Sequence, residues 1–137
     1  MKEIIHFLRE LRMHNNREWF NAHKDEYTRL RKTFETYINQ LIVLIGEKDE
    51  ELHGLEASVC LYRIYRDIRF SPDKTPYKTH FAAYMARGGK NSPRAGYYLH
   101  NFALVHKVKK LRHKVCQTDI ALDLRLAFAT LFGKLNP

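Results

Sequence analysis

The chain has 137 residues, of which 45% are hydrophobic and 28% charged, a balance typical of one globular domain and not of a disordered chain. The apolar run at residues 41–45 is far too short to cross a bilayer. Charged residues interrupt the first turns, where a signal segment would be apolar. We therefore expect a cytoplasmic protein with no membrane association.

The formal net charge of +9 is unevenly distributed along the chain. Residues 1–58 carry nine basic and eleven acidic side chains, a net of −2, whereas residues 59–137 carry fifteen and four, a net of +11. Such a field favours an anionic partner, including nucleic acid, through steering and counterion release. A solvated basic face or internal ion pairs would give the same composition, so charge alone leaves the partner open.

The first half of the sequence predicts two helices. Apolar side chains at helical spacing in residues 2–12 indicate a short amphipathic helix. Asn15 and Glu18 have the spacing of a capping box, so we expect a second helix to begin there. Its apolar stripe steps by three or four residues to Ile45, and Gly46 marks its end, which predicts one helix of roughly 30 residues.

From residue 57 the pattern changes to that of β-structure. Aromatic and β-branched side chains predict strands over residues 59–70, 79–86 and 96–100. Pro72 and Pro76 place a turn after the first strand, and short connections favour an antiparallel meander. The predicted fold class is α+β, an N-terminal helical hairpin with one short and one long helix packed on the meander. Residues 118–135 have the spacing of a further, C-terminal helix.

The densest group of charged side chains lies in residues 63–78. In an extended segment, Asp67 would lie between Arg63 and Arg69 on one face, which would hold the carboxylate ionised and fix the guanidinium planes. We therefore predict an anion-binding pocket in which Asp67 and Asp73 orient the cations or act as general base. Tyr65 and Tyr77 would form its walls. The predicted binding cations are Arg63, Arg66, Arg69, Lys74 and Lys78. A salt-bridge network with a purely structural role is the alternative.

A second candidate site is the corner between the two predicted helices. Asn15, Asn16 and Arg17 stand where backbone N–H groups at a helix start can bind an anion. In the alternative interpretation these residues cap the helix while Trp19 anchors it. We interpret His23, on the apolar stripe, as a core histidine and not as a ligand.

The sequence contains no recognisable cofactor motif. The eight histidines and the two cysteines, Cys60 and Cys116, have no metal-ligand spacing, and the cysteines form no disulfide framework. No phosphate-binding loop, nucleophile elbow or dinucleotide fingerprint is present. We therefore expect no metal and no cofactor, and we expect both cysteines to pack as small apolar groups.

Four longer motifs stand out. They are F-L-x-x-L at residues 7–11, N-N-x-x-W-F-x-x-H-K-x-x-Y at 15–27, R-I-Y-R-D-x-R-F-S-x-D-K-x-P-Y-K at 63–78 and G-Y-Y-L-H at 96–100. In these motifs the chain resembles a bacterial family of conserved hypothetical proteins, domain of unknown function 2461 (DUF2461), over about residues 4–100. The resemblance implies an α+β fold and no particular reaction, because the family has no established activity.

The resemblance ends near residue 100. Family members continue with a glycine-rich segment and further sheet and helix, which nothing in residues 101–137 resembles. We therefore divide the chain into a family-like domain, residues 1–100, and a divergent basic and helical tail, residues 101–137, as a frameshift, a truncation or a genuinely divergent end would produce. The tail carries seven basic and two acidic side chains, so part of the basic charge need not reflect a selected nucleic-acid surface.

Three hypotheses follow. The preferred one is an uncharacterised protein that binds an anionic small molecule in an Arg/Lys/Asp pocket, as an enzyme acting on a phosphorylated or carboxylated compound would. The second is a nucleic-acid-binding module that uses the basic half and its tyrosines. The third is a structural or partner-binding domain without catalysis. The reaction and the oligomeric state do not follow from the sequence.

Overall fold

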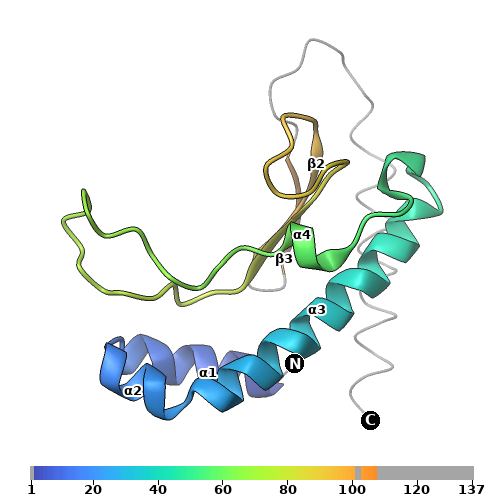
Figure 1. The fold of residues 1–137 in the computed structure, drawn as a ribbon. Helices are drawn as coiled ribbons and strands as arrows, with labels where there is room; N and C mark the ends of the chain where they lie inside the picture. Colours follow the sequence, from blue (N-terminus) through green and yellow to red (C-terminus); the bar gives the residue numbers. More distant parts are fainter. Residues whose placement is uncertain (1, 101–102, 108–137) are drawn as a thin grey trace.

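The fold is α+β, as predicted, with helices first and a small sheet after them. The computed structural model describes residues 2–100 and 103–107 (Figure 1). The predicted helix over 118–135 lies outside the described residues. In chain order, the elements are α1 (Lys2–Met13), α2 (Arg17–Ala22), α3 (Lys24–Gly46), the 3-10 helix η1 (Glu50–Leu52), α4 (Ala57–Cys60), β1 (Ala82–Met85), β2 (Gly96–His100) and β3 (Ala103–Lys107).

The second predicted helix is interrupted at His23, so the prediction of one continuous helix was wrong. His23 has φ −109° and ψ 19°, which ends α2 at Ala22 and lets α3 begin at Lys24. The His23 imidazole turns back on the preceding helix, where Nδ1 donates to the Trp19 carbonyl oxygen at 2.8 Å. A side chain that bonds a helix carbonyl can break a helix without the glycine or proline that would mark the break in the sequence.

The hydrophobic core is built from one side of each long helix and the inner face of the sheet. The predicted stripe of α3 is buried from Leu30 to Ile45. Cys60 is also fully buried, and this burial raises the pKa of its thiol to about 11, so it packs as a small apolar group, as expected. Cys116 lies outside the described residues. The core residues of α1 are Ile4, Phe7, Leu8 and Leu11.

The three strands form an antiparallel meander with β2 between β1 and β3. The strand predicted over residues 96–100 is confirmed as β2, whereas the one predicted over 79–86 is shortened to β1, in which Ala82 pairs with His100. β3 was not predicted. It pairs with β2 although it lies beyond residue 100, where the family motifs end.

Residues 61–81 form an arm that projects from the sheet and lies over α1 and α2 (Figure 1). The prediction of a regular strand over residues 59–70 was therefore wrong. Residues 57–60 are helical, and the chain after them is extended with only two isolated bridges, Leu61 to Ala83 and Tyr65 to Tyr77.

Two prolines explain why the arm is not a regular hairpin. Pro72 lies in the turn of the arm, and Pro76 lies in its returning limb. Neither proline has an N–H to donate to a ladder of hydrogen bonds. The limbs are joined instead by single hydrogen bonds, such as Arg66 N–H to the Pro76 carbonyl at 2.9 Å and Lys78 N–H to the Ile64 carbonyl at 2.8 Å. The arm therefore depends on contacts with the helices for its position.

Candidate functional site

The side chain of Asn15, in the turn between α1 and α2, attaches the arm to the helices. Its Nδ2 donates to the Tyr77 carbonyl oxygen at 2.9 Å, and its Oδ1 accepts from the Tyr77 N–H at 3.1 Å. One side-chain amide thus satisfies both backbone groups of one residue, as a neighbouring strand would. The predicted capping box at Asn15 was wrong, because the helix cap is Asn16, whose side chain accepts from the Trp19 N–H at 2.8 Å.

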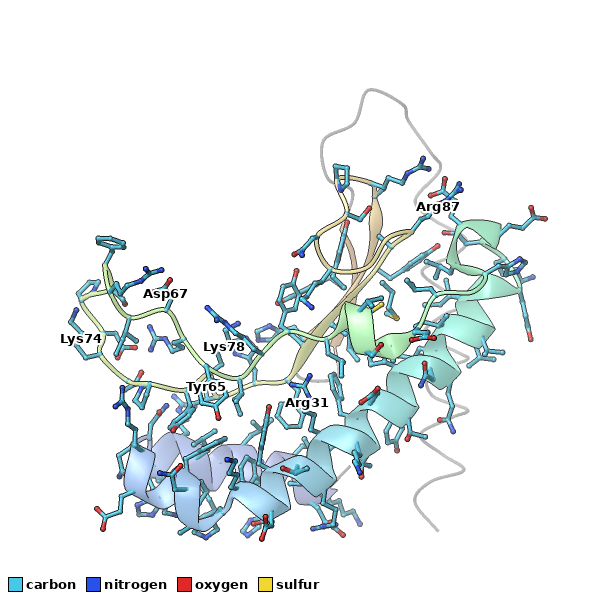
Figure 2. All side chains as sticks on the ribbon, viewed as in Figure 1. Arg31, Tyr65, Asp67, Lys74, Lys78 and Arg87 are labelled. Carbon is cyan, nitrogen blue, oxygen red and sulfur yellow. The ribbon has the colours of Figure 1, made fainter. Side chains whose placement is uncertain are left out.

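Aromatic rings fill the contact between the arm and α2. Phe20 is buried and stacks on Tyr77 with ring centroids 4.0 Å apart, and Tyr65 meets Phe20 edge to face at 5.8 Å. Figure 2 shows Tyr65 directed toward the helices, while Lys78 and Asp67 lie on the other side of the arm. The paired hydrogen bonds between Asn15 and Tyr77, which we call the clamp, and the aromatic rings therefore fix one face of the arm. The other face carries polar side chains.

Arg66 is held in place by its neighbours on the arm. It forms an ion pair with Asp73 and also donates to the hydroxyl of Thr75. The hydrogen bond from Arg66, followed by one from the Thr75 N–H, lowers the pKa of Asp73 to about 2. A carboxylate with such a low pKa is a weak general base at neutral pH, so the arrangement suits Asp73 to orienting the guanidinium.

The arm tip holds three more residues predicted for the pocket, and each of them bonds a neighbour within the tip. Arg69 donates to the Asp67 carboxylate from Nε at 3.0 Å and from Nη2 at 2.7 Å, which lowers the pKa of Asp67. Lys74 Nζ donates to the Ile68 carbonyl at 3.0 Å. Asp67 was expected between Arg63 and Arg69, but among the described residues it bonds only Arg69.

Lys78 is less well compensated than the other cations of the arm. Its Nζ lies 5.6 Å from the centre of the Tyr62 ring. Burial, and then the positive charge of Arg63, lower the pKa of Lys78. It forms no ion pair with a carboxylate of the described residues. A half-buried ammonium beside a second cation is unfavourable until an anion joins it.

A cleft of about 500 Å³ lies along the arm and reaches the C-terminal turn of α1. Of the predicted site residues it brings together Arg66, Asp73, Tyr77 and Lys78. It leaves outside its lining the predicted wall residue Tyr65 and also Arg63, Asp67, Arg69 and Lys74. Sequence analysis missed Arg12, Thr75, Thr79 and His80, which also line the cleft. Arg12 lies on α1 and not on the arm, so no local sequence pattern could have connected it with the arm.

His80 adds an uncharged imidazole to this cleft. It stacks on His100 of β2 with ring centroids 4.1 Å apart. Burial, together with the neighbouring His100 and Lys78, lowers the pKa of His80 to about 4, so it is neutral at pH 7. Arg12, Arg66 and Lys78 against Asp73 then give the cleft a formal charge of +2.

A family model described as "Conserved hypothetical protein (DUF2461)" matches residues 3–103. The chain belongs to the DUF2461 family. The match spans the clamp, the arm and the cleft and confirms the resemblance inferred from the motifs. No curated protein and no solved structure matches the chain. Family membership supplies no reaction, so the function has to be argued from the geometry.

Three residues of the second motif make structural contacts in this DUF2461 chain. Asn15 holds the arm, Asn16 caps α2, and His23 stacks on Trp19 with ring centroids 4.0 Å apart. Arg17 is exposed at the start of α2 and forms no ion pair within the described part of the chain. Because Asn16 already bonds the N–H of Trp19, one of the backbone donors proposed for an anion at this helix start is occupied.

Two further findings bear on the kind of site. Among the described residues, no three His, Cys, Asp or Glu side chains come together in a way that could hold a metal ion. Within the same ranges, no helix combines the length and the apolar character that crossing a membrane requires.

Proposed function

We propose that this DUF2461 chain binds a small anion, a phosphate or carboxylate group, in the cleft that runs along the arm and reaches the end of α1. The observation that carries the proposal is the state of Lys78. Lys78 is partly buried, burial and then the positive charge of Arg63 lower the pKa of its ammonium, and it has no carboxylate partner among the described residues. An anion in the cleft would supply the missing counter-charge.

The surrounding donors suit such a ligand. Arg66 presents a planar guanidinium whose orientation Asp73 fixes, and Arg12 brings a second guanidinium from α1. Planar guanidinium groups match the paired oxygens of phosphate and carboxylate, and an ammonium adds a compact point charge. The hydroxyl of Thr79 and the neutral imidazole of His80 line the same space and add hydrogen-bonding groups.

The size of the cleft indicates that the anionic group belongs to a larger molecule. Its volume of about 500 Å³ lies within the range of small-molecule sites, roughly 300–1,000 Å³. The proposal is one of binding and contains no chemical step. The two carboxylates first considered as bases, Asp67 and Asp73, both have lowered pKa values, which favours an orienting role for them.

Calorimetric titration with inorganic phosphate and with acetate, at constant ionic strength, tests the proposal. We expect saturable binding of at least one of them, and Lys78→Met should weaken it by about tenfold or more, the scale of a lost hydrogen bond to a charged group. Lys32→Met is the matched control, because it removes the same charge from an exposed position on α3. Equal weakening by both substitutions would show only a general field effect and would refute a site at Lys78.

A further inference from the structure

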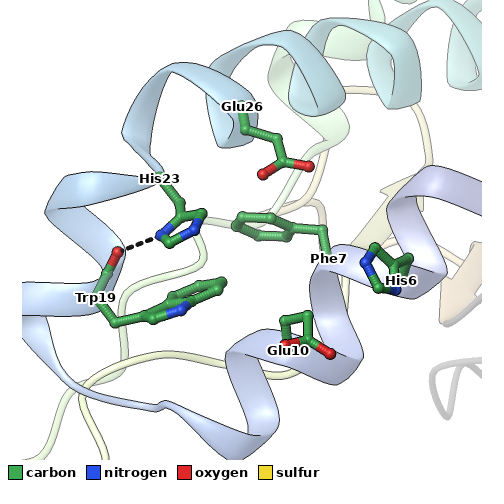
Figure 3. A pocket seen from close by; sticks show the side chains of 6 residues that line it. All are labelled: His6, Phe7, Glu10, Trp19, His23 and Glu26. Carbon is green, nitrogen blue, oxygen red and sulfur yellow. Dashed lines mark hydrogen bonds between the residues drawn. The ribbon is translucent and has the colours of Figure 1, made fainter.

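A second pocket lies at the junction of α1, α2 and α3. It has a volume of about 360 Å³ and is lined by His6, Phe7, Glu10, Trp19, His23 and Glu26 (Figure 3). None of these residues lines the anion cleft. Trp19 and His23 belong to the second sequence motif, which the proposed anion site does not use.

The pocket has an aromatic wall. Trp19 and Phe7 lie with ring centroids 5.7 Å apart, and His23 stacks on Trp19. Phe7 is almost fully buried, whereas Trp19 is only partly buried and so presents indole surface to the pocket. Such a wall accommodates the apolar part of a ligand, and an aromatic ring also attracts a cation placed near it.

Three side chains of the pocket, Glu10, His23 and Glu26, offer hydrogen-bond acceptors. The Trp19 carbonyl oxygen can only accept, so the bond at 2.8 Å requires His23 Nδ1 to carry the proton. In the neutral imidazole, Nε2 is then an acceptor. Glu10 and Glu26 add two carboxylates, and in the view of Figure 3 these lie on either side of the Phe7 ring.

The two carboxylates form no ion pair within the described part of the chain. Glu10 and Glu26 are each partly buried, and neither forms an ion pair with a described basic residue. Arg29, three residues after Glu26 on α3, is already engaged, since its Nη1 bonds the Glu3 carboxylate at 2.6 Å. Two half-buried anions in one pocket therefore attract a cation from outside.

From these contacts we propose that the pocket binds a small organic cation with N–H donors, a primary ammonium or a guanidinium group. Its charge would lie between Glu10 and Glu26, its N–H groups would donate to these carboxylates and to His23 Nε2, and its apolar part would pack on Trp19. A bare metal ion is a poorer fit, because the pocket residues do not form a metal-binding group and the volume exceeds that of an ion.

The fluorescence of Trp19 reports directly on this pocket, because the chain contains a single tryptophan. We would titrate the full chain with methylammonium and methylguanidinium chloride, with sodium chloride holding the ionic strength constant. A saturable change in emission is expected with at least one of them. Tetramethylammonium, which cannot donate hydrogen bonds, should bind about tenfold more weakly, as loss of charge-assisted bonds predicts.

Charge-neutralising variants locate the site. Glu26→Gln and Glu10→Gln should each weaken the binding by about tenfold, while Glu18→Gln, which removes the same charge from an exposed position on α2, should leave it unchanged. The two test variants are independent, so poor folding of one in far-UV circular dichroism leaves the other to decide. An emission change that sodium chloride reproduces, or equal tetramethylammonium affinity, overturns the proposal. So does a response to Zn²⁺ that exceeds the response to both organic cations.

Discussion

Replacing Asn15 by alanine should detach the arm from the helices. The substitution removes two hydrogen bonds, at 2.9 and 3.1 Å, to the backbone of buried Tyr77. Each bond contributes about 1 kcal/mol net, and an unsatisfied buried group costs about 1–3 kcal/mol. We therefore expect Asn15→Ala to lower the free energy of unfolding by about 2 kcal/mol if water reaches Tyr77, and by about 4 kcal/mol if it does not.

Urea unfolding followed by far-UV circular dichroism measures this loss. Asn21→Ala is the matched control, because Asn21 is exposed on α2 and no hydrogen bond of its side chain is present in the described part of the chain; it should change stability by less than about 0.5 kcal/mol. Hydrogen exchange at the Tyr77 and Lys78 amides should also accelerate in Asn15→Ala. If neither the global stability nor the exchange at these amides changes, Asn15 does not clamp the arm and the Phe20–Tyr77 stack alone holds it.

Two other predictions concern the β-structure. Gly89 has φ +80°, and a Cβ there would lie 2.7 Å from the Val59 carbonyl, whereas Gly88, with φ +91°, faces open space. In urea unfolding, Gly89→Ala should therefore lower the free energy of unfolding by about 2 kcal/mol or more, and Gly88→Ala by about 1 kcal/mol. Equal losses would contradict the clash. The folded pKa of His80, about 4, is below its ordinary value of 6.5, so as the pH falls the unfolded chain takes up the proton first. The stability contributed by neutral His80, which is partly buried next to His100 and Lys78, should therefore be complete above pH 6.5 and decline as the pH falls toward 4. His80→Gln should flatten that part of a plot of Tm against pH, and an unchanged slope would assign it to other groups.

Local patterns predicted part of the fold because the forces behind them act over a few residues. The burial stripe of α3 and the strand Gly96–His100 follow from spacing alone, and both are present. The break at His23 and the helix at Ala57–Cys60 were not predicted, because each depends on a contact or a chain direction that the periodicity of side chains does not encode. The arm also escaped prediction: its residues have strand-like composition, but Pro72 and Pro76 deny it a regular partner.

The candidate site, like the fold, was predicted only in part from the sequence. That residues 63–78 hold an unusual density of charge was evident from the sequence, but charge density does not say which cation meets which carboxylate. Arg69 and Lys74 are engaged at the arm tip, and Arg66 and Lys78 remain in the cleft. The difference arises because the arm bends over α1 and α2, which places one part of it against the protein and leaves its tip in solvent.

By itself, the sequence determined the family, the α+β class, the amphipathic helices and the basic character of the second half, since motifs, side-chain periodicity and net charge are properties of the chain. Only the tertiary structure decided that Asn15 pairs with Tyr77 across 62 positions and that Arg12 of α1 joins Lys78 of the arm in one cleft. The physical reason is that such contacts require the chain between them to close into a loop, which costs conformational entropy. Burial of rings such as Phe20 and Tyr77 offsets this cost, and no local pattern specifies which rings meet.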